Sequence, residues 1–187
     1  MANNSAKGST FERDICKRLS LWWTDNDRDD VFWRTSGSGA RATTRAKQNK
    51  TTYGQCGDIQ ATDPIGDPLM KVFAIEIKRG YPNATLSNAF DAAPKSKPQI
   101  IDFIKQAMKS QNDSDAISWM LIHKRNRRQT TVLVPRTILE YIHPQFFDDM
   151  SVIQIELLLK EQSINVVQCC LDDFLEWLEP DDIRNLL

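Results

Sequence analysis

The sequence of 187 residues has few soft metal ligands and no long apolar run. It contains four cysteines and two histidines, and none of the cysteines forms the Cys-x-x-Cys pair of a zinc or redox site. No apolar stretch reaches the roughly 18 residues of a membrane span, and the first residues lack the apolar segment of a signal peptide. These absences disfavour a structural zinc site and a membrane protein. We expect a soluble, cytoplasmic protein with reduced thiols.

Acidic residues are missing from 40–57, and the net charge of −1 hides two oppositely charged regions. Residues 1–137 carry 22 Lys and Arg against 14 Asp and Glu, whereas residues 138–187 carry 2 against 11. A basic body suits a polyanionic partner, because Lys and Arg contacts to phosphate dominate the affinity for nucleic acids. The alternative is a solvated surface on which the charges have segregated.

Hydrophobic periodicity predicts an α/β fold. We expect helices at about 10–23, after Pro98, at 138–142 and at 171–178, and strands at 31–35, 58–62, 70–78, 116–122, 130–134, 152–158 and 164–169. The turn-rich residues 63–68 predict a hairpin, which would place Asp58 and Glu76 on neighbouring strands. This order of elements is typical of helices around a mixed sheet. We divide the chain into a core, 1–137, and an acidic C-terminal elaboration of the same domain, 138–187.

Asp58 and the triplet Glu76-Ile77-Lys78 form the most informative pattern. Glu76 and Lys78 share one face of a predicted strand whose two faces are both mostly apolar. An acid and an amine on such a strand are costly unless they pair or bind something, so they form either a structural ion pair or a metal site. Asp58, directly after a glycine at a strand start, favours the metal site. Hard oxygen ligands indicate Mg²⁺, for which Mn²⁺ can substitute.

A metal at this position would make the chain a nuclease. The metal would polarise a phosphoryl oxygen and lower the pKa of a bound water, while Lys78 would orient that water or balance charge on the phosphate. Glu12 could complete the ligand set directly or through a water. Alternatively, Ser9-Thr10-Phe11-Glu12 has the pattern of a capping box, in which the Glu12 carboxylate is satisfied locally.

Four short motifs together resemble the PD-(D/E)xK nuclease superfamily, and most of all its archaeal-type and phage-type Holliday junction resolvases. They are the segments Lys7-Gly-Ser-Thr-Phe-Glu12, Ser36-Gly-Ser-Gly39, Gly57-Asp-Ile59 and Glu76-Ile-Lys78. The resemblance covers roughly residues 7–134 and implies a restriction-endonuclease-like mixed sheet flanked by helices. It assigns metal binding to Glu12, Asp58 and Glu76, with Ile77 included in the metal site, and a catalytic role to Lys78. Gly57 stands where the motif name has proline.

Further residues are candidates for the site or for binding DNA. The resemblance implies a catalytic role for Ser36 or Ser38, and for Gln106 on the helix after the Glu-x-Lys strand, although Gln106 could simply face solvent. Two basic clusters could grip a nucleic-acid backbone, with a solvated turn as the alternative for the second: Arg34, Arg41, Arg45, Lys47 and Lys50, and Lys124, Arg125, Arg127 and Arg128. We expect most of the five tryptophans to be core residues rather than base-stacking ones.

These observations predict a Mg²⁺-dependent endodeoxyribonuclease that acts on branched or Holliday junction DNA in recombination or repair, in a bacterial, archaeal or phage-infected cell. The resemblance implies a homodimer, whose two-fold axis would place two sites on two strands. One alternative is a restriction-like or replication- or repair-associated phage nuclease of the same fold. Another is a non-catalytic nucleic-acid-binding module. The acidic C-terminal segment could bind a protein partner, pack on the basic body or cover the DNA groove.

Overall fold

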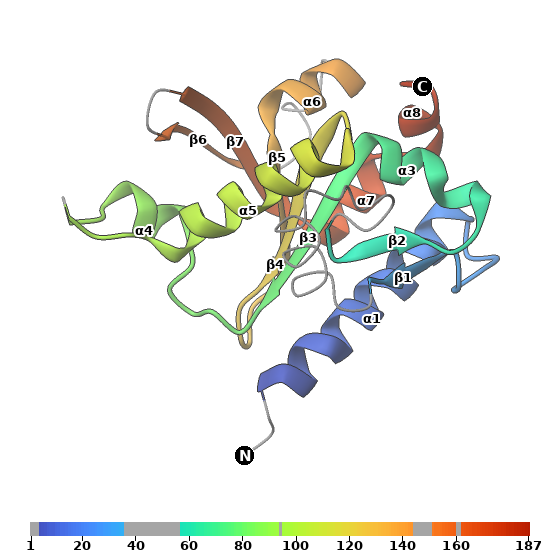
Figure 1. Ribbon diagram of the computed structural model, residues 1–187, viewed down its shortest axis with the longest axis horizontal. Helices are drawn as coiled ribbons and strands as arrows, with labels where there is room; N and C mark the ends of the chain where they lie inside the picture. Colours follow the sequence, from blue (N-terminus) through green and yellow to red (C-terminus); the bar gives the residue numbers. More distant parts are fainter. Residues whose placement is uncertain (1–3, 36–56, 94, 144–150, 160–161) are drawn as a thin grey trace, which may run out of the picture.

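The computed structural model describes residues 4–35, 57–93, 95–143, 151–159 and 162–187, which form two sheets and their surrounding helices (Figure 1). The strands are β1 (Phe32–Arg34), β2 (Ile59–Ala61), β3 (Phe73–Arg79), β4 (Ser118–Lys124), β5 (Thr130–Pro135), β6 (Ile153–Leu159) and β7 (Gln162–Cys170). The helices are α1 (Asn4–Trp23), α3 (Asp67–Val72), α4 (Leu86–Phe90), α5 (Gln99–Ser114), α6 (Arg136–Ile142), α7 (Leu171–Trp177) and α8 (Pro180–Arg184), with a 3₁₀ turn at Pro64–Gly66.

The larger sheet has the strand order β3-β4-β5-β7-β6. Strands β3 and β4 are parallel, because α5 crosses between them, and the other neighbours are antiparallel. Helices α1 and α7 contribute to the hydrophobic core on one face, and α5 contributes to the core on the other. The predicted α/β fold with a mixed sheet flanked by helices is confirmed.

Strand β3 is buried on both faces, as its apolar pattern predicts. Ile75 and Ile77 belong to the core that α1 helps to form, so alternation turns Glu76 and Lys78 toward α5. Glu76 is 2% exposed. A carboxylate at this depth must have partners, since burying an unpaired charge costs several kcal/mol or changes its ionisation.

The segment between β2 and β3 differs from our prediction. Residues 70–72, which we predicted as the start of a strand, belong to helix α3, and 63–68 is not a hairpin turn. Pro68 lies in the first turn of α3, where its fixed φ and missing N–H are tolerated, and Asp67 lies at the positive end of the helix dipole. Strand β2 instead pairs antiparallel with β1 in a separate two-stranded sheet, so β2 and β3 are not sheet neighbours.

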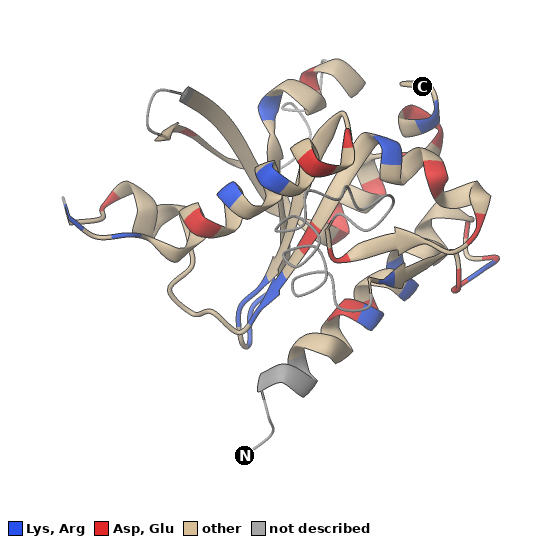
Figure 2. Cartoon of the chain, in the orientation of Figure 1, with Lys and Arg blue, Asp and Glu red and all other residues tan. Residues whose placement is uncertain are grey.

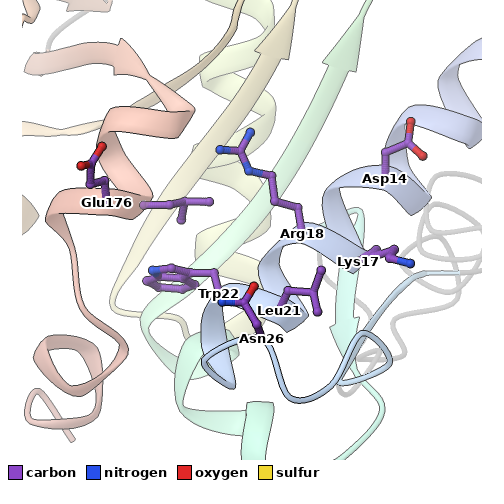
Figure 3. Close-up of a pocket in the computed structure, with 8 residues that line it drawn as sticks. Asp14, Lys17, Arg18, Leu21, Trp22, Asn26 and Glu176 are labelled. Carbon is purple, nitrogen blue, oxygen red and sulfur yellow. The ribbon is translucent and has the colours of Figure 1, made fainter.

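The acidic C-terminal residues complete the larger sheet and pack on α1. Strand β7 lies between β5 and β6, and α7 follows it directly. Asp172 pairs with Arg18, and the indole N–H of Trp22 donates to the carbonyl of Leu178 at 3.0 Å. A groove of about 550 Å³ remains between the two helices, and its lining includes Leu21, Trp22, Leu175 and Glu176 (Figure 3). The acidic C-terminal segment therefore packs on the basic body, which is one of the three roles we considered for it.

The tryptophans divide into core and surface residues. Trp23 and Trp119 are buried, and Trp22 and Trp177 pack partly buried against the core. Four of the five tryptophans thus belong to the core or pack against it, as expected, and Trp33 is the exception at 48% exposed. Its strand has only three residues, with one face on α1, and Trp33 points to the other face.

Within the described part of the chain, no helix combines the length and the apolar character needed to cross a membrane.

Candidate active site

The backbone of Asp58 connects the small sheet to the free edge of β3. Its N–H donates to the carbonyl of Ile75 at 2.7 Å, and its carbonyl accepts from the N–H of Thr35 at 3.0 Å. Gly57, the preceding residue, has φ +84°. The carbonyl of Gly57 also accepts a hydrogen bond from the Thr35 hydroxyl at 2.7 Å. The turn at Gly57 and Asp58 is therefore bonded to Thr35 on one side and to β3 on the other. Asp58 and Glu76 are therefore close although their strands are not paired.

The Asp58 carboxylate lies against the Glu-x-Lys triplet. Its Oδ2 accepts a hydrogen bond from the backbone N–H of Ile77 at 2.7 Å and lies 3.7 Å from Nζ of Lys78. Lys78 is the cation between the two acids, with its Nζ 3.0 Å from Oε2 of Glu76. The three side chains are 3–17% exposed, so the cluster is largely shielded from water but open at the Asp58 end.

Helix α5 supplies two further hydrogen bonds to Glu76. Gln106 Nε2 donates to Oε2 at 2.7 Å, and the Ser110 hydroxyl donates to Oε1 at 2.6 Å. Residues 106 and 110 lie one turn apart on the same face of the helix. Gln106 thus faces the site rather than only solvent. Sequence reasoning missed Ser110, and its four-residue spacing from Gln106 is the signal that could have found it.

Glu12 lies within α1 and not at its start. The helix begins at Asn4, so the capping box predicted at Ser9 to Glu12 is wrong: these residues occupy the helix interior. Glu12 Oε2 instead lies 3.0 Å from Nε of Arg34 on β1. Arg34 also donates to the Ser9 hydroxyl at 2.8 Å. Glu12 is therefore not a helix cap. Arg34, which we expected to contact DNA, instead lies between Glu12 and Ser9.

The acidic groups of this cluster interact electrostatically. Burial and then the charge of Asp58 raise the pKa of Glu76, and the same two causes raise the pKa of Glu12. Burial opposes the ammonium of Lys78, but the charges of Asp58 and Glu76 outweigh it and raise the Lys78 pKa. A cation placed beside Asp58 would therefore favour the ionised forms of Glu12 and Glu76.

The donor set fits a divalent cation that keeps most of its waters. Among the residues described, no group of three or more His, Cys, Asp and Glu side chains is close enough to hold a metal by itself. Mg²⁺, however, is usually held by one or two carboxylates with waters completing its octahedron. Asp58 and Glu76 could supply these. The Ile77 N–H points to the free edge of β3, and the carbonyl of a strand residue points the same way, so Ile77 could add a backbone oxygen.

The basic turn between β4 and β5 lies at the same end of the sheet as Lys78. Lys78 is paired with His123, and Arg79 with Lys124, which begins the cluster of Lys124, Arg125, Arg127 and Arg128. Figure 2 shows the basic residues gathered at the ends of β3, β4 and β5. Other candidates lie outside the described residues: Ser36, Ser38, Arg41, Arg45, Lys47 and Lys50.

The chain was compared with known protein families. Residues 3–185 match the family model described as "Phage putative PDDEXK endonuclease". The chain belongs to this family. No curated protein and no solved structure gave a significant match. Membership supports a phage PD-(D/E)xK endonuclease, and nucleases of this superfamily generally use divalent metals.

The backbone conformation of Gly57 explains why this PD-(D/E)xK chain has a glycine where the motif name has proline. Proline is locked near φ −65°, whereas Gly57 has φ +84°. A side chain here would also collide with β3, because a Cβ on Gly57 would lie 2.6 Å from the carbonyl oxygen of Ile75. Glycine is therefore required by the turn that presents Asp58.

His123 makes the stability of the fold sensitive to pH. Its side chain is buried beside Phe103, and within the described structure its Nε2 has no hydrogen-bond partner. Burial, and then the charge of Arg125, lowers its pKa to about 4. The unfolded chain therefore binds the proton more readily between pH 6.5 and 4, so the free energy of unfolding falls as the pH falls through this range, by at most about 3 kcal/mol.

Replacing His123 with leucine should remove this part of the pH dependence. Urea unfolding of wild type and His123→Leu between pH 7 and 4 measures the free energy of unfolding at each pH. The carboxylates titrate in both proteins, so the difference between the two curves reports on His123. The wild-type curve should fall more steeply below pH 6.5. Parallel curves would show that His123 does not titrate differently in the folded and unfolded states.

Proposed function

We propose that this chain is a Mg²⁺-dependent DNA endonuclease that cuts branched DNA, including Holliday junctions. The observation that carries the proposal is the position of Lys78, 3.0 Å from the Glu76 carboxylate and 3.7 Å from that of Asp58. Two acids and one ammonium at the free edge of a buried strand provide metal ligands and a cation in one place. Membership in a PD-(D/E)xK endonuclease family supports the assignment of hydrolysis.

In this proposal the residues of the site divide the work of metal binding, catalysis and positioning. Asp58, Glu76 and the Ile77 carbonyl would hold the cation, and Glu12 would contribute through a water. When bound, a divalent cation supplies Lewis acidity toward a phosphoryl oxygen and acidifies a coordinated water. Lys78 orients the attacking water or balances charge on the phosphate. Gln106 and Ser110 hold Glu76 in one orientation by their two hydrogen bonds.

Two surfaces would serve the DNA and the assembly. The turn of Lys124, Arg125, Arg127 and Arg128 adjoins Lys78 at the end of the sheet, where it would contact phosphates flanking the cleaved bond. A homodimer would present two such sites to two strands of a junction. The acidic C-terminal segment, which packs on α1 through the pair of Asp172 and Arg18, would offer a protein partner a place to bind.

Purified protein tests the proposal on four-way junction, flap, linear duplex and single-stranded DNA. With Mg²⁺ we expect the junction to be cut fastest, and with EDTA we expect no cutting. Binding without cutting on any substrate in Mg²⁺ would support the non-catalytic binding module instead. Equal cutting of linear duplex and junction would contradict the preference for branched DNA and favour a restriction-like nuclease of the same fold.

A further inference from the structure

The strand β1 has two different faces beside the candidate active site. Phe32 is buried, with its ring centroid 6.2 Å from that of Trp23 on α1, and Arg34 reaches Glu12 on the same helix. Trp33 lies between them in sequence and points to the other face, where it is 48% exposed. The large aromatic side chain of Trp33 is thus about half exposed to solvent, next to Arg34, which contacts Glu12.

The residue opposite Trp33 is an amide. Trp33 pairs with Gln60 on β2, and directly opposed residues of an antiparallel pair share a face. Gln60 also lines a hollow of about 190 Å³ between β2 and the start of β3, together with Phe73 and Ser114. Ser114 lies one helical turn beyond Ser110, the residue that donates to Glu76. Gln60 therefore borders a recess one helical turn from Ser110, and Trp33 lies opposite Gln60 on the neighbouring strand.

The spacing suits a nucleotide strand that passes through the site. Gln60 follows Asp58 by two residues, or about 7 Å of extended strand. One nucleotide of an extended, unpaired strand covers about the same length. A base next to the phosphate at Asp58 could therefore reach Trp33.

We propose that Trp33 and Gln60 form a platform for an unpaired nucleobase of the cleaved strand. The indole stacks on the face of the base, and the Gln60 amide hydrogen-bonds to its edge. Aromatic stacking accepts any base, which suits an enzyme that recognises DNA structure more than sequence. Bases within a continuous duplex are paired and have both faces covered by their neighbours. The platform therefore selects branched DNA in which a base at the branch point, next to the cleaved bond, is unpaired and unstacked, as at a flap or an opened junction. The inference rests on the proposed nuclease function and narrows its substrate class.

Binding measured without cleavage tests the platform. Fluorescence anisotropy in EDTA gives the affinity of wild type, Trp33→Ala and Trp33→Phe for a labelled oligothymidylate and for an abasic oligomer of the same length. We expect Trp33→Ala to bind the oligothymidylate about tenfold more weakly and Trp33→Phe to recover most of the loss. On the abasic oligomer the three proteins should be equal. Tyr141→Ala, which removes an aromatic residue that is 69% exposed on α6, is the matched control.

Two results would overturn the platform. An unchanged affinity of Trp33→Ala for the oligothymidylate excludes stacking, and an equal loss on both oligomers shows that Trp33 acts on the backbone or on the fold. Circular dichroism of each variant identifies the second cause. The nuclease proposal fails separately, if wild type cuts no DNA in Mg²⁺, because the anisotropy experiment requires no cleavage.

Discussion

Replacing Asp58 with asparagine is expected to lower the rate of DNA cleavage by about a thousandfold while the protein remains folded. The asparagine amide oxygen can still accept the Ile77 N–H that Asp58 Oδ2 accepts at 2.7 Å, so the turn keeps its geometry. The lost negative charge removes a metal ligand and the electrostatic partner of Lys78. Single-turnover cleavage of junction DNA in Mg²⁺ measures the rate, and thermal unfolding checks the fold.

Asp102→Asn is the matched control for this change. Asp102 is an exposed aspartate in the first turn of α5, on the helix that carries Gln106 and Ser110. Its replacement should leave the cleavage rate close to that of wild type. A cleavage rate of Asp58→Asn close to wild type would show that the cutting observed does not use this site, and the residue assignment would fail even if the chain is a nuclease.

Replacing Gly57 with alanine is expected to destabilise the protein by about 2–4 kcal/mol and to reduce cleavage strongly. The backbone has φ +84° at this position, and the added Cβ would lie 2.6 Å from the Ile75 carbonyl oxygen. That oxygen accepts the N–H of Asp58, so relief of the collision must move Asp58 away from β3. Urea unfolding gives the stability, and the cleavage assay gives the effect on the site.

Gly80→Ala separates the two causes of this loss. Gly80 has φ +90°, but a Cβ there would meet nothing within 4 Å. The loss of stability in Gly80→Ala therefore comes from the backbone conformation alone and should be about 1–2 kcal/mol. If Gly57→Ala is no more destabilising than Gly80→Ala and cuts DNA as fast as wild type, the close approach to β3 does not position Asp58.

Periodicity and motif spacing predicted much of the fold because these signals are local. The buried strand with Glu76 and Lys78, the helix after Pro98 and the strands near the C-terminus follow from alternating or helical apolar patterns. Residues 70–72 were predicted wrongly as the start of a strand, and 63–68 as a hairpin turn, because a short apolar run fits either element and Pro68 is tolerated in a first helical turn. Glu12 was given a local explanation because a four-residue pattern cannot show that the helix starts at Asn4.

The sequence by itself determined most of the element types, the family motifs and the chemistry of the candidate ligands, since each depends on residues near one another in the chain. Only the tertiary structure decided how these residues meet. Asp58 reaches β3 through one backbone hydrogen bond rather than by strand pairing, Ser110 contacts Glu76 from a helix 34 residues away, and Trp33 is exposed because α1 covers only one face of its strand. Such contacts depend on packing between distant segments, which local patterns do not encode.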